Sequence, residues 1–564
     1  MSNFLDAAKD VSLHSEDNMI LTENGAVVYN SIGSKAVDFM FSVNSLRNKT
    51  TEEICDIFAG VYAENPLIAT KLMFQIGDIR EGKGERHTFN SCLKYYAVNH
   101  PKIAIALLPL IPEYTRWDYA IKLCTCGNKE VENFARKMVV EQLNEDKKNA
   151  QEGKSISLCA KWMPSIQSKK PEDRKLAFKL EEALGFKGNH KAYRKLLAEL
   201  RDKLNIIEKN LSQKTLEEVD FSKMTSKQML KYSNKLQEEQ SENFNEYLEK
   251  VATGEAKMNS SVNTPADIVH MYTESCGWSS KIKPYDLATE MLWKNLKDTI
   301  GDKDTGNTIV IRDGSGSMTC SVSDKTSMTC LEVCTALSIY CAEKLKGELK
   351  DKFITFSSRP EIIDMSKSET LHDKLELCYQ YNDCSNTDLK KTFDLLLETL
   401  KSGKVSPEDA PKTLLILSDM EFDTAHTGSY ERTKLYPLFN QIRDEWEAEG
   451  YKLPTLAFWQ LNAYRSPVPE IDNELGLILL SGFTTDNLDL ILSGELAQYT
   501  PERQLEIVLS NKRYDAVETA FNTGLQMEKG LIRKTSVDAI EIEYESKEPT
   551  GCQKSEPTHS QDRC

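Results

Sequence analysis

The sequence predicts two regions of different fold class, an all-α region and an α/β region that follows it. From Ala36 to about Tyr272, apolar residues recur at helical spacing in one run after another. After Asn307, short runs of β-branched residues alternate with helical patterns, as in doubly wound sheets covered by helices. The chain has 564 residues, which is enough for two or three separate cores.

The helices of the first region are short and closely spaced. One begins at Pro66, where proline suits the first turn, and ends before a charged loop with two glycines at residues 78–87. His100–Pro101 marks another break. Short helices with short connectors predict a HEAT-like helical-repeat module, in which the charged stretch 196–252 forms a long arm or hairpin facing solvent.

The second region predicts alternating strands and helices. Strands are expected near residues 308–312, 353–357, 361–364, 413–418, 454–459 and 476–480. Helices are expected near 328–347, 369–379, 388–401, 432–449, 485–493 and 501–523. The expected organisation is a loosely ordered N-terminus at 1–30, the helical module at 31–300, the α/β domain at 301–525 and a disordered polar tail at 526–564.

The composition is that of a globular protein, with 40% hydrophobic and 28% charged residues. No apolar run reaches the roughly 18 residues of a membrane span, so none is expected. The N-terminus lacks the basic start and apolar run of a secretory signal, and the 14 cysteines show no repeated spacing. These features predict a cytoplasmic protein whose thiols are reduced.

Charge is distributed unevenly along the chain. The net charge is -16, yet residues 147–235 hold 21 Lys and Arg against 11 Asp and Glu, a local balance of +10. The rest of the chain then carries -26. A basic block in an acidic protein is typical of a polyanion site, although a solvated helical surface gives the same pattern.

A candidate metal site follows the apolar run Ile309–Ile311. Asp313, Ser315 and Ser317 are spaced two apart with glycines between them, so a tight loop can turn three oxygen groups to one point. Thr387, before a helical pattern, and Asp419, after a second buried strand, supply further oxygen ligands. An oxygen-only set suits a hard cation, with Mg²⁺ expected first and Mn²⁺ or Ca²⁺ as alternatives.

The segment Asp313–Ser317 also has other possible interpretations. The segment can be a simple polar turn after a strand. An EF-hand does not fit, because Met318 occupies the position that requires glycine. A nucleophile elbow does not fit either, because Asp313 stands where its first glycine would be.

The order of these five residues resembles the metal-ion-dependent adhesion site of von Willebrand factor A domains, and the resemblance covers residues 307–483. It implies that Ser315, Ser317 and Thr387 bind the metal directly, while Asp313 and Asp419 act mainly through water. The neutral hydroxyl ligands would leave the ion electrophilic, with an open position for an acidic side chain of a protein partner.

Four further motifs resemble a family of domains of unknown function whose architecture is similar to the Ro ribonucleoprotein. They are residues 79–86 (IREGKGER), 116–118 (RWD), 159–164 (CAKWMP) and 193–195 (YRK). The resemblance spans most of residues 22–490. It implies a TROVE-like helical module before the A domain and, by analogy with Ro, binding of structured noncoding RNA.

Basic residues in these motifs are the predicted RNA contacts: Arg80, Lys83, Arg86, Arg116, Lys161 and Arg194. Trp117 and Trp162 lie beside basic residues and can stack on unpaired bases, although tryptophans of helical arrays commonly belong to the core. The hypothesis is therefore a noncatalytic RNA-binding protein with an acidic protein ligand at its metal. A protein-only scaffold and a metal-dependent nuclease or phosphatase are the alternatives, and the sequence leaves the oligomeric state open.

Overall fold

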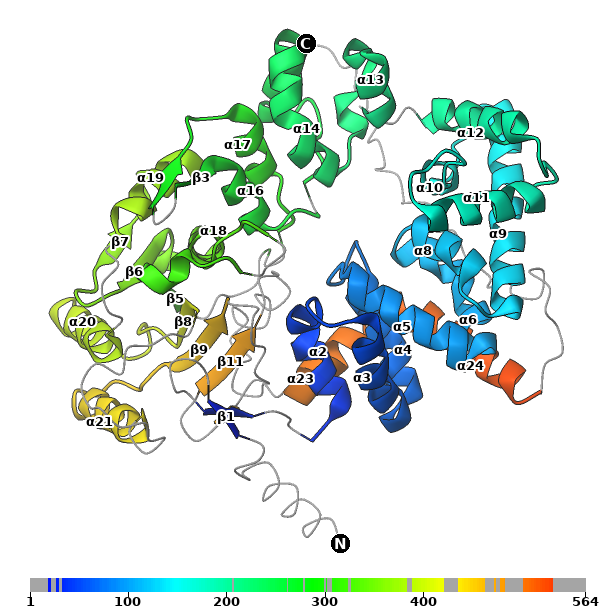
Figure 1. Ribbon diagram of the computed structural model, residues 1–564. Coiled ribbons are helices and arrows are strands. Elements are labelled where there is room, and N and C mark those ends of the chain that lie inside the picture. The colour runs from blue at the N-terminus through cyan, green and yellow to red at the C-terminus, as the bar shows by residue number, and fades with distance from the viewer. Residues whose placement is uncertain are drawn as a thin grey trace, which may run out of the picture.

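The computed structural model places the chain around a ring (Figure 1). It describes residues 19–21, 27–29, 33–204, 207–260, 262–276, 279–298, 301, 307–322, 326–382, 388–419, 435–461, 471–472, 477–481 and 501–530. A mostly helical region comes first and a mixed α/β region second, which confirms the predicted fold class.

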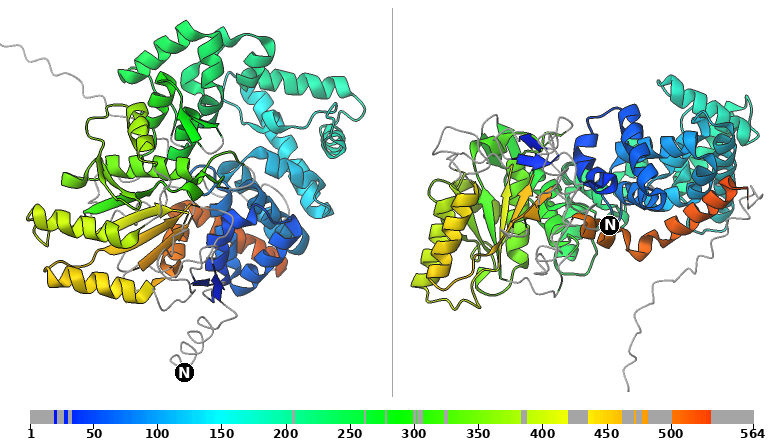
Figure 2. Two further views of the ribbon diagram at one scale, coloured as in Figure 1. Left: turned by 60° about the vertical axis from the view of Figure 1, so that its left-hand side comes forward. Right: turned by 90° about the horizontal axis from the view of Figure 1, so that it is seen from below.

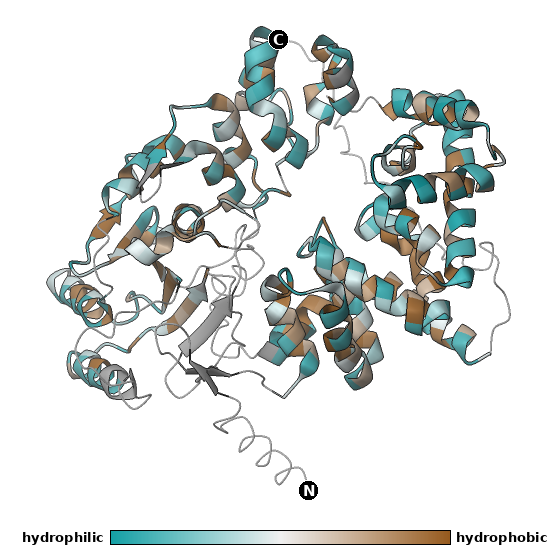
Figure 3. Cartoon of the chain, viewed as in Figure 1, coloured by the Kyte–Doolittle hydropathy of each residue, from teal (hydrophilic) through white to brown (hydrophobic). Residues whose placement is uncertain are grey.

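The helical region begins after a small antiparallel pair, β1 (Met19–Leu21) and β2 (Val27–Tyr29). Its α-helices up to residue 204 are α2 (Lys35–Leu46), α3 (Thr51–Glu64), α4 (Pro66–Gly77), α5 (Arg86–Asn99), α6 (Pro101–Leu107), α7 (Ile111–Tyr114), α8 (Trp117–Lys122), α9 (Lys129–Gln151), α10 (Cys159–Trp162), α11 (Pro171–Ala183) and α12 (His190–Leu204). Helices such as α9 are amphipathic, with hydrophilic and hydrophobic residues alternating along the chain (Figure 3).

Local signals start these helices where the sequence predicts. The Asn65 side chain accepts hydrogen bonds from the N–H groups of Leu67 and Ile68, and Pro66 occupies the first turn of α4. Thr50 and Glu53 form a reciprocal capping box at the start of α3. The predicted helix starting at Pro66 and the loop that follows it are confirmed.

The stretch 196–252 is a set of shorter elements and not one exposed arm. After α12 come α13 (Ile207–Gln213), η4 (Leu216–Glu218), η5 (Phe221–Lys223), α14 (Ser226–Glu239) and α15 (Ser241–Ala252). Helices α14 and α15 form a hairpin at Gln240. Leu236, Phe244 and Leu248 are buried in it, and its apolar side packs against α17 (Leu287–Lys294) in a core that also contains α16 (Pro265–Tyr272).

The α/β region contains a sheet in the order β10-β11-β9-β8-β5-β6-β7. Its strands are β5 (Thr308–Asp313), β6 (Lys352–Phe356), β7 (Ile362–Asp364), β8 (Thr413–Ser418), β9 (Thr455–Gln460), β10 (Ile471–Asp472) and β11 (Leu477–Ser481). β6, β5, β8, β9 and β11 run parallel, with β7 and β10 antiparallel at the edges. The predicted strands are confirmed within about two residues, the usual uncertainty of element ends, and β10 was not expected.

Helices cover both faces of this sheet, as in a doubly wound fold. Helices α18 (Cys330–Lys344) and α19 (Leu371–Gln380) share one core with Val310, Leu415 and Ala457. Helices α20 (Leu389–Ser402) and α21 (Leu435–Ala448) share another with Ile309 and Ile416 on the opposite face. Alternate residues of β5 and β8 therefore serve two cores, which explains their unbroken apolar runs.

The C-terminal helices return to the N-terminal ones. Residues 501–523, predicted as one helix of the α/β region, are α23 (Pro501–Leu509), η11 (Lys512–Tyr514) and most of α24 (Asp515–Glu528). Helix α24 lies along α6 and α4 (Figure 2). The approach is close, because a Cβ added at Gly524 would lie 2.5 Å from Ile103 Cα.

The cores cross the expected domain boundary. Helices α2–α12 share one core with α23 and α24, whereas α13–α17 belong to the same core as α18 and one face of the sheet. The helical stretch 31–300 therefore contributes to two cores. Most of the expected loose N-terminus at 1–30, the helix at 485–493 and all of the tail beyond residue 530 lie outside the described residues. Among the helices described, none has the length and hydrophobicity to span a membrane.

A buried ion pair joins the two ends of the chain. The Asp78 carboxylate follows α4 and is fully buried. Arg513 of η11 donates to it through Nε and through Nη2, the latter at 2.9 Å. The Arg513 guanidinium also lies over the Tyr114 ring, 4.7 Å from its centroid, and Tyr114 stacks with Tyr514. Asp78 holds the pKa of Arg513 above its ordinary value.

We expect Arg513→Ala to lower the free energy of unfolding by about 3 kcal/mol, because it leaves the Asp78 carboxylate buried without its partner charge. Urea unfolding followed by circular dichroism measures the change. The matched control is Arg503→Ala, which removes an exposed pair with Glu506 and should change stability by less than about 0.5 kcal/mol. Equal losses in the two variants would contradict this role of Arg513.

Candidate functional site

Two neighbouring strands carry the predicted metal ligands to one edge of the sheet. β5 and β8 are parallel partners, and Arg312 pairs with Leu417. The next residues, Asp313 and Ser418, are therefore adjacent at the carboxyl ends of their strands, and Asp419 follows directly. Ligands of open α/β sheets bind at this edge.

The loop after β5 is held by hydrogen bonds to Asp313, whose side chain is fully buried. Asp313 Oδ1 accepts the Ser315 N–H at 2.9 Å, and Oδ2 accepts the Ser418 hydroxyl at 2.5 Å. The hydroxyl oxygens of Ser315 and Ser317 lie 3.1 Å apart. The Asp419 N–H donates to the sulfur of Met318 at 3.2 Å.

Burial and charge repulsion both act on Asp313. Burial first, and then the neighbouring Asp419 carboxylate, raise its pKa to about 6 against the opposing effect of the hydrogen bonds from Ser418 and Ser315. Asp419 is itself buried. Two close carboxylates beside two hydroxyls make an oxygen-only donor set, so the described residues fit a hard divalent cation.

Four of the five predicted ligands come together, and the fifth lies outside the described residues. Thr387 is the last residue before Asp388, whose side chain caps α20 by accepting the Lys391 N–H. Asn382, the last described residue before Thr387, accepts a hydrogen bond from the buried Arg312 at 2.6 Å. Within the described residues, no group of three His, Cys, Asp or Glu side chains can hold a metal. A cation here would therefore depend on the serine hydroxyls.

The second candidate site is a cavity of about 1260 Å³ at the centre of the ring. Its wall combines the loops after α4 and α7 with α10, the end of α12, α14, the start of α16, Met328 before α18, Tyr340 within α18, and α23. Basic residues outnumber acidic ones along it. The basic ones are Arg47, Arg80, Lys83, Arg86, Arg116, Lys161, Lys203, Lys223, Lys227, Lys231 and Lys297, against Glu81, Glu85, Glu208, Asp220 and Asp267.

Five of the six predicted RNA contacts line this cavity, namely Arg80, Lys83, Arg86, Arg116 and Lys161. Arg194 does not, because it lies exposed on α12 with its Nε directed to the His190 carbonyl. The prediction missed six other lining cations: Arg47, Lys203, Lys223, Lys227, Lys231 and Lys297. Four of these fall in the basic block 147–235, which was therefore the signal available in the sequence.

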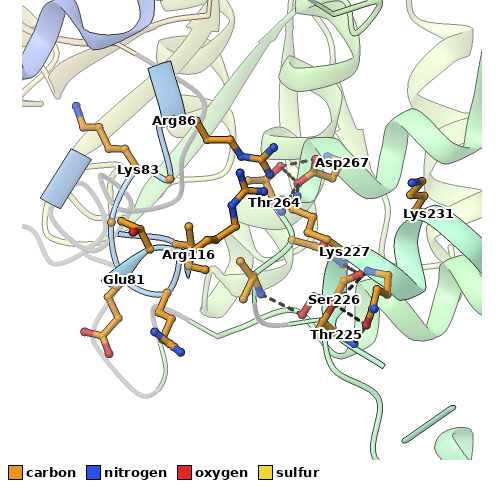
Figure 4. Close-up of a pocket in the computed structure, with 18 of the residues that line it drawn as sticks. Glu81, Lys83, Arg86, Arg116, Thr225, Ser226, Lys227, Lys231, Thr264 and Asp267 are labelled. Carbon is orange, nitrogen blue, oxygen red and sulfur yellow. Dashed lines mark hydrogen bonds and ion pairs between the residues drawn. The ribbon is translucent and has the colours of Figure 1, made fainter. Parts of the chain in front are cut away.

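Cations face one another across the cavity (Figure 4). Arg86 and Arg116, from the N-terminal helices, point toward Lys227 and Asp267 on α14 and α16. Lys227 pairs with Asp267 at 2.7 Å, and Arg116 pairs with Asp118 at 2.9 Å. These two ion pairs neutralise the positive charges of Lys227 and Arg116.

Other lining cations keep their charge exposed. Arg80, Arg86, Lys203 and Lys231 are exposed, and within the described part of the chain no carboxylate forms an ion pair with them. Arg80 lies in the loop after α4, Arg86 begins α5, and Lys203 is near the end of α12, all on the side of the N-terminal core, whereas Lys231 is on α14 of the second core. Their charges are available to an anion that enters the cavity.

The loop that carries Arg80 and Lys83 is tightly held. Lys83 N–H donates to the Gln75 carbonyl at 3.0 Å, and Asp78 accepts the Arg80 N–H at 2.9 Å. A Cβ at Gly82 would lie 2.0 Å from the Gln75 oxygen, so only glycine allows this approach. The loop therefore presents its cations from a fixed backbone.

The two tryptophans have different environments. Trp117 is buried in the helical core, as expected for a packing residue. Trp162 is half-buried on the cavity wall, with the Arg116 guanidinium 4.3 Å from its ring centroid. Both tryptophans line the cavity, and Trp162 is the more exposed of the two.

Comparisons with known proteins match nearly the whole chain. A model described as a domain of unknown function (DUF2828) matches residues 22–116 and 131–306, and a second one (DUF7788) matches residues 307–531. Uncharacterized protein L728 of Acanthamoeba polyphaga mimivirus is 26% identical over 526 residues, covering 87% of each chain.

Among solved structures, the Ro (RSR) protein of Deinococcus radiodurans resembles this chain at a TM-score of 0.36 and 11% identity, covering 82% of this chain and 99% of that one. This similarity is distant. Along the chain, the match to the DUF2828 model comes first and the match to the DUF7788 model follows it directly.

Proposed function

We propose that this protein is a noncatalytic, cytoplasmic RNA-binding protein, which holds an unpaired stretch of structured noncoding RNA in the central cavity. The observation that carries this proposal is the excess of basic residues along the cavity wall in a chain whose net charge is -16. Phosphate groups supply most of the affinity of such sites, and a concave basic surface concentrates the field.

The size and the walls of the cavity favour an extended polyanion. Its volume of about 1260 Å³ exceeds the roughly 300–1,000 Å³ of ordinary small-molecule pockets. Arg80, Arg86 and Lys203 from the elements of the N-terminal core, and Lys231 from α14 of the second core, are exposed to a strand between them. The accessible face of Trp162 offers a stacking surface for an unpaired base.

The α/β domain has the second part of the proposed function, which is to hold a divalent cation, Mg²⁺ first. Ser315, Ser317 and Thr387 would bind it directly, and Asp313 and Asp419 would act through water and by orienting the hydroxyls. When bound, the ion supplies positive charge that attracts an acidic side chain of a protein partner. The closeness of Asp313 and Asp419 supports this assignment, because a cation would offset their repulsion.

Removing cavity cations should weaken RNA binding and its dependence on salt. We expect Arg86→Ala and Lys231→Ala to lower affinity for a structured RNA with a single-stranded end, and each to reduce the salt slope by about 0.7. Filter binding across a salt titration measures both. Arg194→Ala is the control, because this exposed cation lies outside the cavity. Flat salt dependence, or an equal loss with Arg194→Ala, would refute the cavity as the RNA site.

Metal binding should depend on the Asp313 carboxylate and on pH. We expect Asp313→Asn to weaken Mn²⁺ affinity by about 10–100-fold, with Asp364→Asn, an exposed carboxylate on β7, as the unchanged control. Affinity should fall as pH drops through about 6, because protons then compete for Asp313. Electron paramagnetic resonance of Mn²⁺ measures both effects, and equal affinity in the two variants would exclude this site.

Variants of the two aspartates, together with EDTA and RNase, distinguish an RNA-binding protein from a protein-only scaffold and from a nuclease or phosphatase. A scaffold predicts partner capture that requires Asp313, is abolished by EDTA and survives RNase treatment. A nuclease or phosphatase predicts metal-dependent turnover by the wild type that Asp419→Ala abolishes. An RNA-binding protein without catalysis predicts RNA that is retained and intact.

A further inference from the structure

A short hairpin joins the proposed metal loop to α18. Ser321 and Thr329 form an antiparallel bridge. On one side of it the Val322 N–H donates to the Met328 carbonyl at 2.9 Å, and on the other the Cys330 N–H donates to the Cys320 carbonyl at 2.9 Å. Cys320 and Cys330 are therefore opposite each other across the hairpin.

The two sulfur atoms are already neighbours. Cys320 Sγ and Cys330 Sγ lie 3.7 Å apart as thiols. Directly opposite residues of a hydrogen-bonded antiparallel pair have Cα atoms about 5.5 Å apart, which lies within the roughly 4.4–6.8 Å that a disulfide spans. Closing the bond from this arrangement requires no change of strand pairing.

Exposure distinguishes Cys320 from the other cysteines whose side chains are described. Among the ten cysteines whose side chains the structure describes, only Cys320 is exposed, whereas Cys330 is fully buried at the first turn of α18. A reagent in solution therefore reaches Cys320 first, and Cys330 is the residue in position to resolve the product.

We propose that Cys320 and Cys330 are an oxidative modification site, at which a low-molecular-weight disulfide converts the two thiols into an intramolecular disulfide. The Cys320 thiolate attacks one sulfur of the small disulfide, whose S–S bond breaks and releases one thiol after protonation. Cys330 then attacks Cys320 Sγ, the mixed S–S bond breaks, and the proton of Cys330 passes to the second small thiol as it leaves. The two cysteines are oxidised, and the small disulfide is reduced to two thiols.

The new bond acts on the metal loop through the backbone. The Cys320 N–H donates to the Ser317 carbonyl at 3.1 Å, so a displacement of Cys320 is passed to Ser317. Bond formation shortens the sulfur separation from 3.7 Å to about 2.0 Å and draws Cys320 toward α18. Metal ligands tolerate errors of about 0.2 Å, so oxidation weakens cation binding. This consequence rests on the proposed metal site, whereas the disulfide itself does not.

The experiment treats the reduced full-length protein with oxidised glutathione and maps its peptides by mass spectrometry without reduction. We expect a cross-link between the peptides of Cys320 and Cys330 that dithiothreitol removes. Cys320→Ser should abolish it, and Cys126→Ser, a half-buried thiol on another core, should leave it unchanged. Absence of the cross-link, or a glutathione adduct on Cys320 that persists, would overturn the proposal.

Mn²⁺ titration of the same samples tests the consequence. Oxidation should weaken affinity about tenfold in the wild type and leave Cys320→Ser unaffected. A cross-link with unchanged affinity would overturn the coupling to the metal loop. Failure of the reduced wild type to bind Mn²⁺ would instead overturn the proposed metal site, while a mapped cross-link would still establish the thiol pair.

Discussion

The fully buried Asp78 carboxylate is the constraint on which the arrangement of the ring depends. A charge in that position must be paired, and its partner, Arg513, comes 435 residues later. The same Asp78 accepts the Arg80 N–H, and its carbonyl accepts the Gly84 N–H. One residue therefore secures both the return of the C-terminal helices and the basic loop that faces the cavity.

By holding the basic loop in place, the Asp78–Arg513 ion pair contributes to the positive charge of the cavity wall. The chain as a whole is acidic, whereas the cavity wall concentrates cations from several segments. The cations come from the loop before α5, from α12 and from α14, which are brought to one space by the closure of the ring. The hairpin 320–330 extends this arrangement, since Met328 lines the cavity and Cys320 contacts the Ser317 backbone of the metal loop.

Local patterns predicted the elements well and their distant contacts poorly. The apolar strands β5 and β8 could be recognised because every residue in them is buried, and their polar ends placed Asp313 and Asp419 at one edge. The cations of residues 79–86 were identified from their motif. Arg194 was assigned to the same surface, but α12 turns it away from the cavity.

Contacts between distant parts of the chain could not be predicted, because the neighbouring sequence does not indicate them. Nothing near Arg513 marks it as the partner of Asp78, so helix 501–523 was expected beside the sheet and not against α4 and α6. The opposition of Cys320 and Cys330 depends on a hairpin that the apolar pattern does not show. The side of α14 that faces the cavity likewise depends on tertiary packing, which is why Lys227 and Lys231 were only counted within a basic block.

Photo-crosslinking of a single-stranded RNA end that carries 4-thiouridine tests the central claim most directly, because it locates the strand without altering the protein. The account predicts that adducts, mapped by mass spectrometry, fall on both walls of the cavity, at Trp162 and Arg86 on one side and Lys231 on the other. Adducts confined to the outer surface, for example around Arg194 on α12, would contradict it.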